Sequence, residues 1–121
     1  MTEKSSNRFK GKLGEDIGEI YLKNHGYKIL ERNVQSPFGE IDMIALHQGT
    51  LVFVEVKSRR DNSFGYPEEA ITRQKKTRLT KLATWHMKRY TKTPQARFDV
   101  LAIQAEGAES GIRLIQNAFE I

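Results

Sequence analysis

Hydrophobic side chains in the first half of the chain change from a helical to an alternating pattern. Apolar positions recur at helical spacing over residues 9–24, and Gly26 provides a C-terminal stop, so this segment predicts a helix. The core stripe of this helix is expected to contain Leu13, Ile17, Ile20 and Tyr21. Segments rich in Ile and Val predict strands over residues 27–33, 39–47 and 50–58. The last two are predicted to form a hairpin around Gln48 and Gly49.

The second half of the chain contains one long helical pattern and shorter apolar runs. Residues 59–66 have the composition of a loop, and Pro67, followed by two glutamates, opens a helix that reaches roughly to Tyr90. Its core stripe is expected to contain Ile71, Leu79, Leu82, His86 and Tyr90. Apolar runs at 98–103 and 112–115 predict one or two further strands. The order α-β-β-β-α-β-β predicts an α/β fold, with a mixed sheet of four to five strands flanked by helices.

The length and composition fit one soluble domain. A chain of 121 residues without repeats is expected to form a single domain over 1–121, with residues 1–7 as a flexible tail. The absence of cysteine excludes disulfide scaffolds, thiolate zinc sites and cysteine nucleophiles. No apolar run approaches the length of a membrane span, so a cytoplasmic protein without a membrane partner is expected. The net charge of +5 suits a polyanion, although a surface that is merely soluble explains it equally well.

The predicted hairpin brings acidic residues of two strands together. If its turn is centred on residues 48–49, opposed residues have numbers that sum to 97. Asp42 then lies opposite Glu55, and Glu40 lies opposite Lys57, all on one side of the sheet. The other side is wholly apolar and consists of Ile41, Met43, Ala45, Val52, Val54 and Val56. A loop of odd length would shift this register, so the prediction depends on the turn.

Two opposed carboxylates need a positive partner. Their Cβ atoms would stand about 5 Å apart, where like charges destabilise a sheet unless something neutralises them. Mg²⁺ is a suitable partner because it is held by one or two carboxylates while it accepts phosphate oxygens. Lys57 on the same face could reach an attacking water or a phosphoryl oxygen, and Glu40 could bind an outer water. The alternative is a surface ion-pair lattice in which Lys57 or an arginine neutralises Asp42.

Glycines in the first helix indicate a close approach to another backbone. Gly11, Gly14 and Gly18 lie on the flank opposite most of the apolar stripe, and each glycine costs a helix about 1 kcal/mol relative to alanine. Glu15 lies among them and would be carried toward the sheet as a metal ligand or a hydrogen-bond acceptor. The alternative is a flexible helix start with a solvated Glu15.

The second helix and the loop before it carry the densest basic region. This region is predicted to track DNA phosphates, with a solvated helix surface as the equal alternative. It comprises Arg59, Arg60, Arg73, Lys75, Lys76, Arg78 and Lys81. Outside it, Asp99 is expected to pair with a basic neighbour such as Arg97 or Arg113.

These residues lie in motifs that resemble the YraN-like family of predicted endonucleases, which is similar to archaeal Holliday-junction resolvases of the PD-(D/E)xK nuclease superfamily. The similarity includes Gly11-x-x-Gly14-Glu15, Gly39-Glu40-Ile41-Asp42, Val54-Glu55-Val56-Lys57-x-Arg59, Lys75 and Arg97-Phe98-Asp99-Val100. It implies a restriction-endonuclease-like core in which Asp42 and Glu55 hold the metal, Lys57 is the catalytic lysine and Glu15 is a helix-borne acid. Ile41 replaces the proline of the superfamily motif. Because such resolvases work as dimers, the resemblance also implies a homodimer.

The sequence therefore predicts a metal-dependent DNA endonuclease. Asp42, Glu55 and Glu15 would bind Mg²⁺, for which Mn²⁺ would substitute, and Lys57 would stabilise developing charge. The substrate would be branched or duplex DNA. The alternative is a non-catalytic nucleic-acid-binding module that keeps the nuclease fold and the basic surface.

Overall fold

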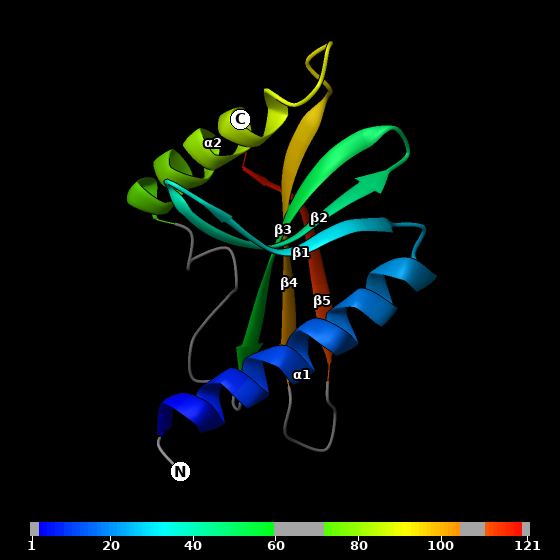
Figure 1. The fold of residues 1–121 in the computed structure, drawn as a ribbon. Helices are drawn as coiled ribbons and strands as arrows, with labels where there is room; N and C mark the ends of the chain where they lie inside the picture. Colours follow the sequence, from blue (N-terminus) through cyan, green and yellow to red (C-terminus); the bar gives the residue numbers. More distant parts are fainter. Residues whose placement is uncertain (1–2, 60–71, 105–110, 120–121) are drawn as a thin grey trace.

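The computed structural model describes residues 3–59, 72–104 and 111–119 of the chain. Its elements are α1 (Glu3–Asn24), β1 (Lys28–Ser36), β2 (Gly39–His47), β3 (Thr50–Arg59), α2 (Arg73–Met87), β4 (Ala96–Gln104) and β5 (Ile112–Phe119) (Figure 1). The predicted order α-β-β-β-α-β-β is confirmed. The first helix begins at Glu3, ahead of the predicted start and inside the segment expected to be a tail.

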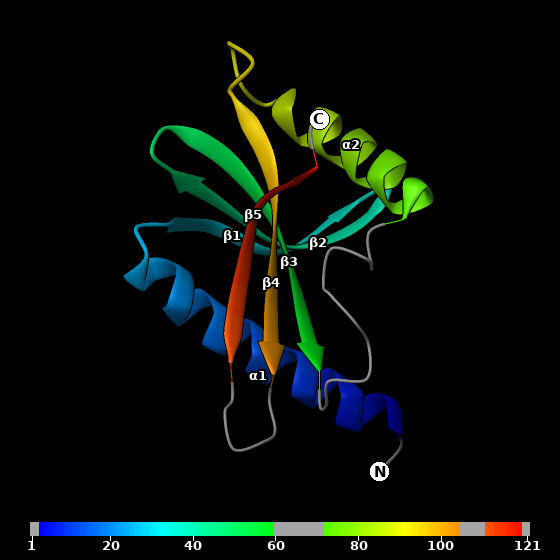
Figure 2. The same ribbon diagram turned by 180° about the vertical axis from the view of Figure 1, so that it is seen from behind.

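The five strands form one mixed sheet in the order β1-β2-β3-β4-β5. β3 and β4 are parallel, and all other neighbours are antiparallel. Two antiparallel strands can be joined by a tight turn, but a parallel pair needs a crossover connection, and α2 lies in the crossover between β3 and β4. The two helices lie on opposite faces of the sheet (Figures 1 and 2). The arrangement is consistent with a restriction-endonuclease-like fold.

The β2–β3 hairpin has the predicted register. Its paired residues run from His47↔Thr50 to Met43↔Val54, and their numbers sum to 97 in every pair. Gln48 and Gly49 form the turn with φ values of 50° and 81°, the left-handed conformation that a type I′ hairpin turn requires at both positions. The turn therefore fixes the register on which the predicted grouping of acidic residues depends.

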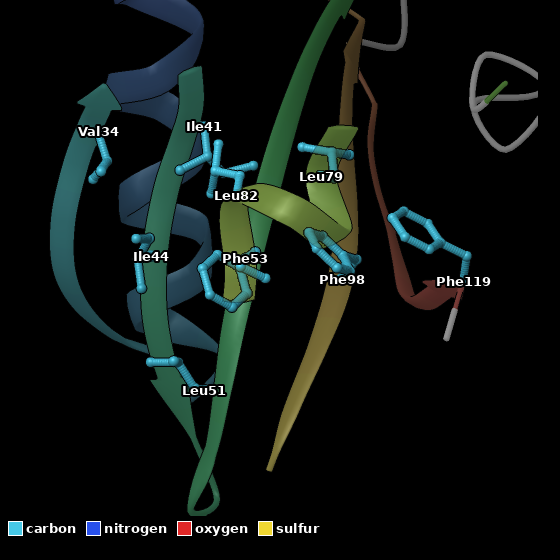
Figure 3. Packing of buried hydrophobic residues seen from close by; sticks show 10 residues of the cluster. Val34, Ile41, Ile44, Leu51, Phe53, Leu79, Leu82, Phe98 and Phe119 are labelled. Carbon is cyan, nitrogen blue, oxygen red and sulfur yellow. The ribbon is translucent and has the colours of Figure 1, made fainter. Parts of the chain in front are cut away.

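A hydrophobic core lies on each side of the sheet. On the α2 side, Ile44, Phe53 and Phe98 pack against Leu79 and Leu82 (Figure 3). On the α1 side, the buried residues are Leu22, Tyr27, Met43, Ala45, Val52, Val54, Leu101 and Ile103. The prediction that Ile41 shares a face with Met43 is wrong, because Ile41 belongs to the α2 side. Residues two apart on a regular strand share a face, so β2 changes face at Asp42, where its ladder to β3 ends.

The face of α1 that meets the sheet differs from the predicted one. Leu13, Ile17 and Ile20 are 52%, 36% and 62% exposed, whereas Gly14 and Gly18 are buried. A Cβ added at Gly18 would lie 2.9 Å from Leu101 Cδ2. The glycines thus allow the helix backbone to approach the sheet closely, as predicted, and this approach turns the larger apolar side chains outward.

Helix α2 has a side-chain cap at its N-terminus. Thr72 has an extended backbone and its side chain accepts a hydrogen bond from the Lys75 amide, so it caps a helix that starts at Arg73. Arg59 was predicted to begin a loop but belongs to β3. The rest of that predicted loop, the predicted helix start at Pro67 and the core position Ile71 lie outside the described residues. Leu79, Leu82 and His86 are buried as predicted. Tyr90 is exposed because the helix ends at Met87. No helix in the described part of the chain is long and apolar enough to cross a membrane.

A polar network ties β4 to β5 and to the start of β1. Asp99 is 1% exposed and accepts hydrogen bonds from the Arg97 guanidinium, the Tyr27 hydroxyl and the Asn117 amide, at 2.7–3.2 Å. The predicted pairing of Asp99 with a basic neighbour is thereby confirmed, with Arg97 as the partner. Asn117 has φ 52° where the β4–β5 register shifts, so the Asp99 carboxylate also stabilises an irregular stretch of β5. Because each polar group in this network contacts another, we assign it a structural role.

Candidate active site

Asp42 lies where β2 and β3 stop pairing. Its Oδ2 atom accepts a hydrogen bond of 2.7 Å from the Val56 amide. At this point, beyond the end of the β2–β3 ladder, the acceptor is therefore a side-chain oxygen and not a main-chain carbonyl. Burial raises the pKa of Asp42 to about 6; the Val56 bond opposes this rise, and the charges of Glu15, Glu55 and Glu40 add to it. A carboxylate in such surroundings is stabilised by an added cation.

Glu55 projects from β3 and meets two lysines. Its Oε1 atom lies 2.7 Å from Lys75 Nζ and 3.7 Å from Lys57 Nζ. The other oxygen, Oε2, is buried and has no hydrogen-bond partner among the described residues. A buried carboxylate oxygen without a partner is uncommon, since desolvation without a compensating bond costs about 1–3 kcal/mol. Glu55 therefore combines one neutralised oxygen with one that is available to a ligand.

Lys57 and Lys75 place two ammonium groups beside the carboxylates. Burial lowers the pKa of Lys57, the neighbouring Lys75 lowers it further, and the negative charge of Glu55 opposes the change. Lys57 comes from β3 and Lys75 from the first turn of α2, so the crossover connection brings together residues that are distant in sequence. Two partly buried ammonium groups can hold the negative oxygens of a phosphate group.

Glu15 faces the site but is held by an arginine. Its Oε1 atom lies 3.3 Å from Arg32, which also pairs with Asp16 at 2.8 Å and with Glu19 at 3.2 Å. Because the charge of Glu15 helps to raise the pKa of Asp42, the two carboxylates are within electrostatic reach of each other. In the part of the chain that the structure describes, no three His, Cys, Asp or Glu side chains form a group that could hold a metal. The structure thus places both Glu15 and Glu55 within electrostatic reach of Asp42, and each of the two glutamates also pairs with a cationic side chain of the protein.

The predicted basic region divides into an inner and an outer part. Lys75 points inward to Glu55, whereas Arg73 and Lys76 are exposed on α2. Arg78 lies over the turn between β1 and β2 and donates to the carbonyl oxygens of Phe38 and Glu40 at 3.4 and 3.3 Å. The side chain of Arg59 and all of Arg60 lie outside what the structure describes. The Glu40 side chain is exposed and accepts a hydrogen bond from Gln35.

Sequence reasoning missed two of these contacts. Lys75 was predicted to lie in the phosphate-binding surface and, by its match to the family motif, to be able to reach the scissile phosphate, but its contact with Glu55 was not predicted. It precedes Leu79, Leu82 and His86 on the same stripe of the helix. A lysine that continues a core stripe is a readable sign that its ammonium group lies against the sheet. Arg32 offered no comparable sign, because its three acidic partners belong to another element whose facing side the sequence predicted incorrectly.

Comparisons with known proteins extend over nearly the whole chain. A model of the Uncharacterised protein family UPF0102 matches residues 14–103, a range that contains every acidic and lysine residue of the candidate site. A "UPF0102 protein" of Persephonella marina is 47% identical over 93% of this chain and 94% of its own length. The "UPF0102 protein" of Pelobacter propionicus is 45% identical over 99% of this chain and 89% of its own length. The "UPF0102 protein" of Syntrophotalea carbinolica is 42% identical over 92% of this chain and 91% of its own length. These names state no activity.

Proposed function

This chain belongs to the uncharacterised protein family UPF0102, and we propose that it is a metal-dependent endonuclease that hydrolyses phosphodiester bonds in DNA. One observation carries the proposal. Two carboxylates, Asp42 and Glu55, converge at the end of a hairpin beside two partly buried lysines. Carboxylates that bind a divalent cation, next to ammonium groups that bind phosphate oxygens, are the groups that phosphodiester hydrolysis requires.

The carboxylates fit a hard divalent cation. Oxygen ligands of this kind suit Mg²⁺, and Mn²⁺ is expected to substitute. Asp42 would gain a neutralising charge, and the Oε2 atom of Glu55 would gain the partner that the described residues do not supply. When bound, the ion would polarise the phosphate and lower the pKa of a water molecule. Glu15 could join these ligands only by leaving Arg32, so its part in metal binding stays a prediction.

The lysines would act on the phosphate itself. Lys57 is held by burial and by Glu55 at a place where its ammonium group can stabilise negative charge that develops on a phosphoryl oxygen. Lys75 already neutralises Glu55 and could turn to the substrate once another cation takes that role. The exposed Arg73 and Lys76 on the same helix extend the positive charge outward and would hold neighbouring phosphates of the DNA backbone.

Cleavage of labelled DNA tests this function. Wild-type protein is incubated with duplex and branched DNA in Mg²⁺, Mn²⁺ or EDTA, and Asp42→Asn and Lys57→Ala are compared with it. Lys28→Ala serves as the matched control, because Lys28 is exposed at the start of β1 and pairs with Leu46 near the opposite end of β2. Metal-dependent cleavage that is lost in both site variants and kept in the control supports the proposal. Salt-sensitive binding without cleavage by wild type would instead favour a non-catalytic nucleic-acid-binding module.

A further inference from the structure

The turn between β1 and β2 presents an aromatic side chain to solvent. Phe38 is 38% exposed, whereas Phe53, Phe98 and Phe119 are buried. Ser36 fixes the turn locally, because its hydroxyl accepts a hydrogen bond from the Phe38 amide at 3.0 Å and donates one to the Gly39 carbonyl at 2.8 Å. The backbone that carries Phe38 is therefore ordered by its own hydrogen bonds.

Arg78 attaches this turn to the candidate active site. Its guanidinium group donates to the Phe38 and Glu40 carbonyls and packs so closely on Gly39 that a Cβ there would lie 2.5 Å from it. Figures 1 and 2 both show the turn beside the N-terminal end of α2. Lys75, which contacts Glu55, precedes Arg78 by three residues, or about 4.5 Å along the helix axis. The turn that carries Phe38 is thus held by the same helix that supplies Lys75 to the candidate site.

An exposed aromatic ring on a turn that an arginine holds suits a nucleobase. Side chains such as Arg73, Lys76 and Arg78 attract phosphates without regard to sequence, whereas an aromatic ring binds the flat face of a base. In a continuous duplex, the neighbouring base pairs cover both faces of each base. Only an unpaired, unstacked base offers a free face to Phe38.

We infer that Phe38 is a base-stacking residue that makes this protein prefer DNA with an unpaired base beside the bound phosphate. The inference rests on the proposed function for the identity of the polymer and for the position of the cleaved bond. It names a substrate class: duplexes interrupted by a bulge or a splayed arm, in preference to fully paired DNA, including a fully paired four-way junction.

Binding in EDTA tests this inference apart from catalysis. Fluorescence anisotropy would compare a duplex with the same duplex carrying one bulged 2-aminopurine, whose fluorescence falls when it stacks on an aromatic ring. The proteins are wild type, Phe38→Ala, Phe38→Leu and the control Tyr90→Ala. Tyr90 is a matched aromatic at 40% exposure, but it lies beyond the C-terminal end of α2. Because Phe38 is exposed, its variants are expected to fold, which circular dichroism verifies.

Wild type is expected to bind the bulged duplex more tightly than the paired one and to quench 2-aminopurine. Phe38→Ala is expected to weaken binding of the bulged duplex by about 5- to 100-fold, while its affinity for the paired duplex is unchanged. Phe38→Leu should resemble Phe38→Ala, and Tyr90→Ala should resemble wild type. An unchanged preference in Phe38→Ala, or failure of wild type to bind DNA, overturns the inference. Selective binding without cleavage in Mg²⁺ would uphold it and reject only the endonuclease.

Discussion

Replacement of Asp42 by asparagine is expected to stabilise the metal-free protein at neutral pH, although Asp42 is central to the proposed site. Burial, assisted by neighbouring carboxylates, raises the pKa of Asp42 from 3.8 to about 6, so its negative charge is unfavourable in the folded state. Asparagine keeps an oxygen that can accept the hydrogen bond from Val56 and carries no charge. The variant therefore removes the cost of the charge and retains the contact.

The size and the pH dependence of the effect follow from proton linkage. One pKa unit corresponds to about 1.4 kcal/mol, so a shift from 3.8 to about 6 sets an upper limit of roughly 3 kcal/mol on the effect. Because Asp42 is partly exposed, solvent screening reduces the expected effect to about 1–2 kcal/mol. The folded state binds the proton more tightly than the unfolded state, so wild-type stability falls as pH rises between about 4 and 6. The advantage of Asp42→Asn is therefore full above about pH 6 and disappears near pH 4.

Urea denaturation of both proteins over this pH range, in EDTA and in Mg²⁺, measures the effect. A magnesium concentration about 100-fold above Kd would stabilise wild type by about 2.7 kcal/mol, and Asp42→Asn should lose most of this gain. Asp16→Asn is the control, because that carboxylate is 47% exposed and paired with Arg32. If Asp42→Asn were less stable than wild type near pH 7.5 in EDTA, the carboxylate would be well satisfied in the folded protein, and our account of the site would be wrong.

Three further predictions concern single substitutions. Lys57→Ala should lower the single-turnover cleavage rate by about 100- to 1000-fold but leave stabilisation by Mg²⁺ intact, which thermal denaturation checks. Gly18→Ala should lower the free energy of unfolding in urea by up to about 2 kcal/mol, because the clash with the buried Leu101 outweighs the gain of about 1 kcal/mol in helix propensity. Arg97→Ala should cost about 3–5 kcal/mol by the same measurement, since it leaves the Asp99 carboxylate buried without its cation, and a smaller loss would contradict that assignment.

The register of the hairpin was predictable because it depends on the length and conformation of a single turn. Alternation of apolar residues assigns each side chain to a face only after the turn is known, and Gln48-Gly49 is a turn that accommodates positive φ at both positions. The pairing of residues 43–47 with residues 50–54 could therefore be predicted from sequence alone, whereas the predicted pair of Asp42 and Glu55 lies one position beyond the end of this ladder. The change of face at Asp42 was not predictable, since it arises where the carboxylate replaces a main-chain partner of Val56.

The orientation of α1 shows why hydrophobicity alone selected the wrong helix face. The prediction of the buried helix face considered only the hydrophobicity of each side chain, and by that criterion Leu13, Ile17 and Ile20 should face the core. Burial also depends on how near the backbone comes to the sheet, and Gly14 and Gly18 allow an approach that larger side chains would prevent. The glycines predicted this close approach correctly, and they indicate the buried face of α1 better than the apolar stripe does.

The charges around the site indicate how metal binding would affect the ion pair between Glu55 and Lys75. Two of the predicted ligands already hold a cation of the protein: Lys75 contacts Glu55 at 2.7 Å, and Arg32 contacts Glu15 at 3.3 Å. Asp42 accepts a hydrogen bond from the neutral Val56 amide, and because burial raises its pKa, a bound cation would stabilise its charged form. Asp42 and the unpartnered oxygen of Glu55 would hold a divalent ion, and the charge of that ion would weaken the ion pair between Glu55 and Lys75. Metal binding and exposure of Lys75 to a phosphate would then be one coupled event.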